Sequence, residues 1–195
     1  MFNRLQAALV ICALASLTVA TAWGQFGVPL NRSDQQLEPV KIRELVAQYC
    51  RLDYAGARLS ASDWPKIQPT VAWRTNPDFP LFMVTGRFDV SPEIDSSHGK
   101  YTVTVRYKLL GKFDLAEGYS QDVANRVQTV QFTVMEVNGD WRITEIEPGY
   151  PHPSKTAALR WINSKLSETS DPATKMMYQH ALESLQAQKF SPLAQ

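Results

Sequence analysis

Apolar and polar residues alternate along two β-type runs between residues 126 and 147, which meet at Asn138-Gly139. Asn-Gly supplies the two positive-φ positions of a type I′ turn, so this pattern predicts a β-hairpin with a two-residue loop. The turn places Val134 opposite Ile143, and successive side chains along each strand point to opposite faces of the hairpin. One face of the hairpin is then apolar and is formed by Val130, Phe132, Val134, Trp141 and Ile143.

Two glutamates disturb this apolar face. The same register, continued without a break, places Glu145 opposite Phe132 and Glu147 opposite Val130. A buried carboxylate is unfavourable, so the preferred interpretation is a β-bulge that turns both acids outward and Ile146 inward. The alternative leaves Glu145 facing an apolar interior, where its pKa would rise as a general base near neutral pH requires.

Helical periodicity lies on both sides of this β-rich region. Apolar residues recur at steps of three and four over residues 39–54, which predicts an amphipathic helix that stops before Gly56. A shorter helical piece follows around Trp64. After the hairpin the helical period returns in two segments, whose N-caps are Ser154 and Asp171.

Period-two alternation predicts strands over residues 82–90 and 101–109. The polar residues 91–100 are expected to connect them, and residues 111–125 are expected to form a loop before the hairpin. Helices that flank a run of neighbouring strands are typical of the α+β class. We therefore expect an antiparallel sheet with helices on one face, followed by a C-terminal helical pair.

The first 24 residues have the pattern of a secretory signal peptide. Arg4 precedes an apolar run, and small residues allow cleavage after Ala22 or Gly24. The run is short for a transmembrane helix, which takes about 20 residues, although an uncleaved anchor is the alternative. We expect a periplasmic or secreted protein without a stable membrane anchor after cleavage, and a flexible lead-in over residues 25–37.

Composition narrows the range of partners. The chain of 195 residues is 44% hydrophobic and 20% charged, as in ordinary globular proteins. Removal of residues 1–24 deletes one of the 20 basic residues and none of the 19 acidic ones, so the mature chain is neutral. A neutral chain is an unlikely nucleic-acid partner. Only Cys50 survives cleavage, and it is expected to be a buried hydrophobic residue rather than half of a disulfide.

Three features together resemble the nuclear transport factor 2-like superfamily: the first helix with Ala55-Gly56 after it, the aromatic short helix around Trp64, and the strand Gly139-Asp-Trp-Arg-Ile143. The resemblance covers about residues 38–148. It implies a domain over residues 38–150 in which a curved sheet wraps over helices and forms a cone with a pocket. The helical extension over residues 151–195 departs from the family pattern, and a lid, a brace or a homodimer element are its alternative roles.

The superfamily includes acid–base enzymes such as isomerases, dehydratases and cyclases, as well as many non-enzymes. Tyr49 resembles the first-helix tyrosine that donates a hydrogen bond to an oxyanion in the steroid isomerases. Such an enzyme also needs a carboxylate, and Glu145 is the best single candidate in this sequence. One tyrosine in an amphipathic helix is more often a core residue, because a catalytic site needs several converging groups.

No metal or cofactor site is indicated. None of the histidines His98, His152 and His180 has a second ligand at metal-binding spacing, and a histidine in a loop is usually solvated. Glycine-rich phosphate loops, nucleophile elbows and dinucleotide fingerprints are absent from the sequence. We therefore expect neither a bound metal nor a cofactor.

Two main hypotheses follow. The first is a non-catalytic exported domain that binds a small apolar ligand or a protein partner in or around its cone. The residues expected to line the pocket, which otherwise fill the core, are Tyr49, Trp64, Tyr107, Phe132, Trp141 and Glu145. The second is a small acid–base enzyme that uses Tyr49 with a carboxylate such as Glu145. A third and purely structural role is self-association through the C-terminal helices.

Overall fold

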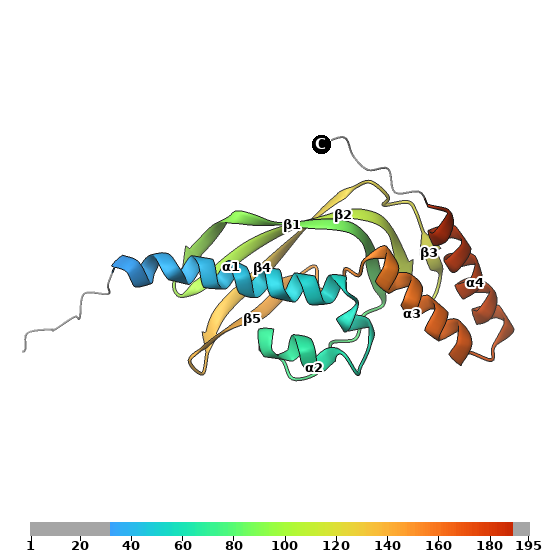
Figure 1. The fold of residues 1–195 in the computed structure, drawn as a ribbon, viewed down its shortest axis with the longest axis horizontal. Helices are drawn as coiled ribbons and strands as arrows, with labels where there is room; N and C mark the ends of the chain where they lie inside the picture. Colours follow the sequence, from blue (N-terminus) through green and yellow to red (C-terminus); the bar gives the residue numbers. More distant parts are fainter. Residues whose placement is uncertain (1–31, 189–195) are drawn as a thin grey trace, which may run out of the picture. The chain divides into compact units, whose positions relative to one another are not determined.

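The computed structural model describes residues 32–188, which form an α+β unit (Figure 1). The α-helices are α1 (Arg32–Tyr54), α2 (Trp64–Ile67), α3 (Lys155–Glu168) and α4 (Pro172–Ala187), and the short 3-10 helices are η1 (Ala57–Leu59) and η2 (Gln68–Thr70). The strands are β1 (Leu81–Ser97), β2 (Lys100–Asp114), β3 (Gly118–Ser120), β4 (Val127–Val137) and β5 (Asp140–Glu147). The predicted α+β class is confirmed.

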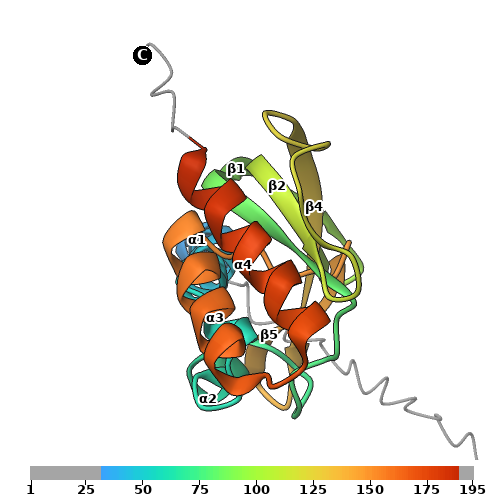
Figure 2. The same cartoon turned by 90° about the vertical axis from the view of Figure 1, so that its right-hand side faces the viewer.

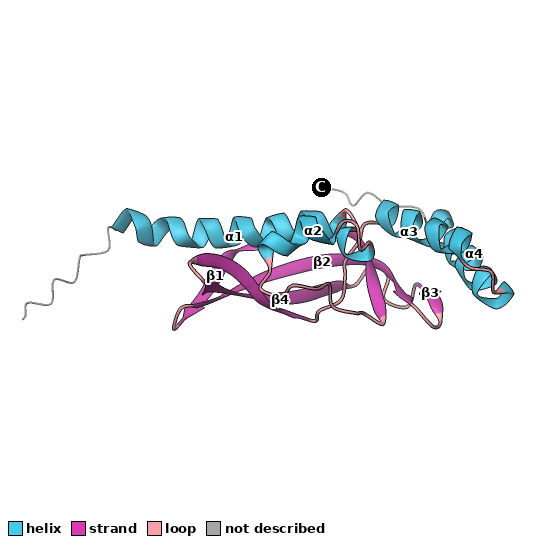
Figure 3. Cartoon of the chain, turned by 90° about the horizontal axis from the view of Figure 1, so that it is seen from below, coloured by secondary structure: helices cyan, strands magenta, loops and turns pink. Residues whose placement is uncertain are grey.

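All strand pairs of the described sheet are antiparallel, and the order is β1-β2-β4-β5 with β3 paired to the end of β2. Sequential strands lie next to one another, as short hairpin connections dictate. Figure 3 shows α1, α2 and α3 along one side of the strands. The predicted antiparallel sheet is therefore confirmed.

The hairpin of β4 and β5 has the predicted turn and the predicted bulge. Asn138 and Gly139 have φ angles of 55° and 88°, and Val134 pairs with Ile143. Beyond this pair the register shifts, so that Phe132 faces Ile146 rather than Glu145. Glu145 and Glu147 are consequently exposed. One extra residue in β5 thus removes two carboxylates from the apolar face.

The polar connection predicted over residues 91–100 is wrong. Strand β1 continues to Ser97, and the turn is confined to His98 and Gly99, whose φ angles are 51° and 75°. A register shift between Val90 and Ile94 interrupts the alternation of apolar and polar residues. The sequence pattern therefore does not show that the strand continues. Backbone pairing with β2 therefore extends the strand although most of its side chains there are exposed.

The loop predicted over residues 111–125 is also partly wrong, because β2 runs on to Asp114 and β3 pairs with it. A second irregularity near Thr85 lets the consecutive residues Leu109 and Leu110 both be buried, which hides the period of two. Helix α1 begins at Arg32 and contains Pro39 in its interior, so the expected start at residue 39 is wrong. Proline lacks one amide donor, but here the helix continues through it.

Two clusters of buried apolar residues hold the unit together. The first joins α1, α2 and the middle of the sheet, and it includes Ile42, Val46, Val103, Phe132 and Ile143. The second joins α3 and α4 to the far ends of β1 and β2, and it includes Phe82, Val84, Phe113, Ile162 and Leu185. Figure 2 shows α3 and α4 side by side. The C-terminal helices therefore contribute to the hydrophobic core of the described chain.

The helix boundaries at this end follow the predicted capping residues. The Ser154 side chain accepts a hydrogen bond from the Ala157 amide at 3.2 Å, and Asp171 accepts one from the Thr174 amide at 2.8 Å. Each cap satisfies an amide that has no partner inside its helix. Gly56, two residues after the last residue of α1, has a φ angle of 93°, as expected for a helix stop.

We predict that Gly56→Ala destabilises the fold more than Gly139→Ala does. Both glycines have a positive φ angle, so each substitution should lower the free energy of unfolding by about 1 kcal/mol. At Gly56 the added Cβ would also lie 2.9 Å from the Cβ of Ala157, whereas nothing lies within 4 Å at Gly139. We therefore expect a total loss of about 2–4 kcal/mol for Gly56→Ala in urea unfolding. Equal losses would contradict the close contact between Gly56 and α3.

Candidate functional site

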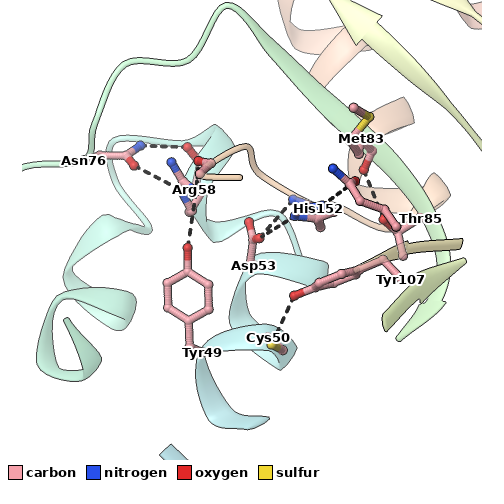
Figure 4. A network of polar contacts seen from close by, with 11 residues as sticks. Tyr49, Cys50, Asp53, Arg58, Asn76, Met83, Thr85, Tyr107 and His152 are labelled. Atoms are coloured by element: carbon pink, nitrogen blue, oxygen red, sulfur yellow. Dashed lines mark hydrogen bonds and ion pairs between the residues drawn. The ribbon is translucent and has the colours of Figure 1, made fainter. Parts of the chain in front are cut away.

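Six polar or ionisable side chains meet where α1, η1, β2 and the segment after β5 converge (Figure 4). We call them the buried polar cluster: Tyr49, Cys50, Asp53, Arg58, Tyr107 and His152. All six are buried, and the three that can carry charge at neutral pH or below, Asp53, Arg58 and His152, are only 1%, 2% and 2% exposed. Buried ionisable groups are rare and need partners, so this cluster is the foremost candidate site.

Arg58 is anchored by neutral acceptors. Its Nη1 donates to the carbonyl of Gly149 at 2.9 Å and to the hydroxyl of Tyr49 at 3.3 Å. The Asn76 amide nitrogen donates to the Arg58 carbonyl at 2.7 Å, and the Asn76 side-chain oxygen accepts from Nε at 3.5 Å. Among the side chains described for residues 38–188, no carboxylate oxygen lies within 4.0 Å of its guanidinium. The guanidinium is therefore held by hydrogen bonds to uncharged groups, and the carboxylate of Asp53 is the opposite charge that interacts with it over a longer distance.

The carboxylate of Asp53 is hydrogen-bonded to the backbone amide of His152. The His152 amide donates to Asp53 Oδ2 at 2.9 Å, and the ring nitrogen Nδ1 lies 4.0 Å from the same oxygen. The other ring nitrogen, Nε2, lies 3.0 Å from Oε1 of Gln128, and the imidazole stacks on Tyr107 with ring centroids 4.0 Å apart. Asp53 Oδ1 is buried and has no hydrogen-bond partner in the described chain. One carboxylate oxygen of Asp53 thus accepts a hydrogen bond, and the other has none in the described chain.

Burial decides the protonation of these groups. It raises the pKa of Asp53 to about 6, although Arg58 and the His152 amide oppose the shift. Burial and the charge of Arg58 together lower the pKa of His152 to about 3. At neutral pH Asp53 is therefore ionised and His152 is neutral. The buried carboxylate and the buried guanidinium then balance one another in charge.

The remaining members of the cluster are protonated at neutral pH. Burial raises the pKa of the Cys50 thiol to about 12, and the Tyr107 hydroxyl donates to its sulfur at 3.1 Å. Burial also raises the pKa of Tyr49 and of Tyr107. A thiol is a weak nucleophile because only the thiolate reacts readily. The cluster therefore offers hydrogen-bond donors but no activated nucleophile.

The structure places the residues expected to line a pocket at different depths. Tyr49, Trp64, Tyr107 and Phe132 are buried core residues, and the rings of Tyr49 and Phe132 meet edge to face at 5.5 Å. The Trp64 indole nitrogen donates to the carbonyl of Arg74 at 3.1 Å. Trp141 is half-buried, with its ring edge to face with that of Tyr101. Glu145 is exposed, so the structure does not bring it to Tyr49.

Asp53, Arg58 and His152 are the site residues that sequence reasoning missed. The expectation that a loop histidine is solvated is wrong for His152, because this residue is held in the core by its amide and its ring. A sequence signal existed for Asp53, since Tyr49 and Asp53 are four residues apart and lie on one helical face. No local pattern pointed to Arg58 or His152, whose partners are distant in the sequence.

Clefts open elsewhere on the unit. One of about 340 Å³ lies between the residues around Gly56 and helix α3. A second of about 470 Å³, here called the methionine cleft, is lined by Glu117, Gly118, Tyr119, Ala173, Met176, Met177 and His180. In residues 32–188 no three His, Cys, Asp or Glu side chains gather as metal ligands. Over the same residues, no helix combines the length and the hydropathy that crossing a bilayer takes.

We predict that acid stabilises the wild-type protein relative to Asp53→Asn. A carboxyl whose pKa is raised in the folded state binds its proton more tightly there than in the unfolded chain, so its contribution to stability grows as the pH falls through 6. The amide of asparagine still accepts from His152 but does not titrate. We expect the unfolding free energy of the wild type to gain about 2–3 kcal/mol over that of the variant between pH 8 and pH 4.

The check is urea unfolding of both proteins across this pH range. His152 is common to both proteins, so its own titration, which lowers stability in acid, largely cancels in the difference. A difference that is flat with pH, or that falls toward acid, would contradict a raised pKa at Asp53.

The resemblance to the nuclear transport factor 2-like superfamily rests on the residue pattern over about 38–148 and stays a prediction. No protein-family model, curated protein or solved structure matches this chain.

Proposed function

We propose that this chain is an exported, non-catalytic domain that binds a small apolar ligand or a protein partner. We infer that residues 38–150 adopt the cone-like arrangement of the nuclear transport factor 2-like superfamily, and that binding takes place in or around this cone. The export part of the proposal rests on residues 1–24, which lie outside the described residues. The binding part rests on the methionine cleft, which lies between β3 and α4.

The single observation that carries the non-catalytic part is that the hydrogen bonds of the buried polar cluster are made to other groups of the protein, including the side chains of Asn76 and Gln128. Arg58 donates to Tyr49 and to a backbone carbonyl, Tyr107 donates to Cys50, and Asp53 accepts from a backbone amide. A catalytic group must reach a substrate atom within hydrogen-bond distance. Side chains that bond one another beneath the surface support the fold instead.

The methionine cleft supports the binding part of the proposal. Met176 is 71% exposed at its rim, and Met177 and Tyr119 extend the apolar lining toward β3. Methionine is flexible and polarisable, so methionine-rich surfaces adapt to apolar partners of different shape. The volume of about 470 Å³ lies within the range of about 300–1,000 Å³ that is usual for small-molecule sites.

A specific observation favours one alternative, a small acid–base enzyme. Asp53 has a pKa near 6, lies one helical turn from Tyr49 and keeps one oxygen without a partner. A carboxyl with such a pKa can act as a general acid or base near neutral pH. Asp53 would then take the role that the sequence suggested for Glu145. This alternative requires a path by which a substrate reaches the cluster.

Cys50 reports on such a path, because its sulfur lies in the cluster and is fully buried. The chain contains two cysteines, so Cys12→Ser leaves Cys50 as the only thiol. We predict that a small methanethiosulfonate reagent modifies folded Cys12→Ser at least about 100-fold more slowly than the urea-unfolded chain, because burial also raises the pKa of the thiol. Rates within about tenfold of each other would reveal access and favour the enzyme.

We predict that the uncharged dye Nile red binds the folded protein and that Met176→Gln weakens this binding about five- to tenfold. The change removes an apolar side chain from the methionine cleft, and the expected loss follows from the apolar area that the dye would cover there. Met135→Gln is the matched control, since Met135 is a partly exposed methionine on β4 outside the cleft. Equal loss in both variants, or no binding by the wild type, would contradict the proposed site.

A further inference from the structure

A third cleft, of about 510 Å³, lies at the start of β4 and across the neighbouring parts of β1 and β2. We call it the basic cleft, and its lining residues are Arg87, Phe88, Asp89, Arg106, Lys108 and Val127. Three cations and one carboxylate therefore surround one hollow. The cleft shares no residue with the buried polar cluster or with the methionine cleft.

The register of the sheet concentrates positive charge in this cleft. Arg87 of β1 pairs directly with Lys108 of β2, and Arg106 pairs with Asp89. Like charges that face each other across two antiparallel strands repel and destabilise the sheet. The pairing of Arg87 with Lys108 therefore lowers the stability of the folded sheet.

The described lining only partly neutralises these cations, because the one carboxylate, that of Asp89, offsets one of the three positive charges. No ion pair within 4.0 Å and no side-chain hydrogen bond joins Arg87, Arg106 or Lys108 to another of the residues 38–188, whose side chains the structure describes. By contrast, Lys112 on the same strand lies 3.6 Å from a carboxylate oxygen of Asp122. The donors of the basic cleft are thus free to bind an anion from solution, and an anion would relieve the repulsion between Arg87 and Lys108.

The apolar part of the lining narrows the class of ligand. Val127 pairs with Lys108 and is 62% exposed, an unusual position for a valine. An apolar group held on Val127 would lie next to the charged groups of Lys108 and Arg87. Two guanidinium forks and one ammonium suit a doubly charged oxyanion, because arginine binds phosphate with two parallel hydrogen bonds.

We propose that the basic cleft binds a phosphate monoester whose organic substituent is small and apolar. The phosphate accepts hydrogen bonds from Arg87, Arg106 and Lys108, while the substituent packs on Val127. This site goes beyond the proposed function, since it lies apart from the methionine cleft and serves a different chemical class of ligand. Binding there needs no covalent step.

Phenyl phosphate is the probe, titrated calorimetrically into the full chain at pH 7.5 and low ionic strength, where screening is weak. We expect saturable binding to the wild type and about tenfold weaker binding to Lys108→Gln, which loses one charge-assisted hydrogen bond. Lys100→Gln is the matched control, because it removes the same charge from the same face of β2 outside the cleft. Its affinity should remain within about twofold of the wild type.

Thermal unfolding provides a second measurement, because a lysine that only supports the fold would not change the effect of phenyl phosphate on the Tm. Without ligand, Lys108→Gln should raise the Tm by about 1–2 °C, because it removes the repulsion with Arg87. Phenyl phosphate at one fixed concentration should raise the Tm of the wild type more than that of Lys108→Gln, because the variant binds about tenfold more weakly. Arg87→Gln should behave in the same way, so the inference stays testable if one variant does not fold.

Three outcomes would overturn the proposal. Binding that does not saturate would remove the site, and equal loss in Lys100→Gln and Lys108→Gln would reduce the effect to long-range attraction. Benzoate that binds as tightly as phenyl phosphate would show that the cleft does not select phosphate monoesters over carboxylates. Each outcome leaves the test of the methionine cleft with Nile red unaffected, so the two proposals succeed or fail separately.

Discussion

The attachment of the segment 149–154 to helix α1 is the constraint on which the rest of the unit depends. Arg58 holds the carbonyl of Gly149, and Asp53 holds the amide of His152, 99 residues further along the chain. The same segment receives hydrogen bonds from the amides of Met83 and Thr85 on β1, and the Ser154 amide donates to the carbonyl of Tyr54. A segment that lacks regular structure is thus fixed to both the helix and the sheet.

This attachment explains how two apolar clusters form one structure. The first cluster contains α1 and the middle of the sheet, and the second contains α3 and α4 with the far ends of β1 and β2. Segment 149–154 leads from β5, in the first cluster, to α3, in the second. Its polar bonds set where α3 begins, since Ser154 both bonds to Tyr54 and caps the helix. Hydrophobic burial then stabilises what the hydrogen bonds have positioned.

The same reasoning assigns different roles to buried and exposed polar groups. In the buried polar cluster, the charges of Asp53 and Arg58 balance one another at neutral pH, and removal of either would leave the other uncompensated in the core. In the basic cleft, Arg87, Arg106 and Lys108 reach solvent and have no ion pair within 4.0 Å to the described side chains of residues 38–188. The buried charges therefore stabilise the fold, whereas the binding that we propose belongs to exposed side chains.

The sequence by itself determined the features that short-range physics controls: the Asn138-Gly139 turn, the bulge that exposes Glu145, the caps at Ser154 and Asp171, and the α+β class. Side-chain period and turn chemistry act over a few residues, so they can be read locally. Only the tertiary structure decided that His152 is buried, that Arg58 binds Tyr49, and that Arg87 faces Lys108. These contacts join residues from different elements, and register shifts in β1 broke the alternation that local patterns need.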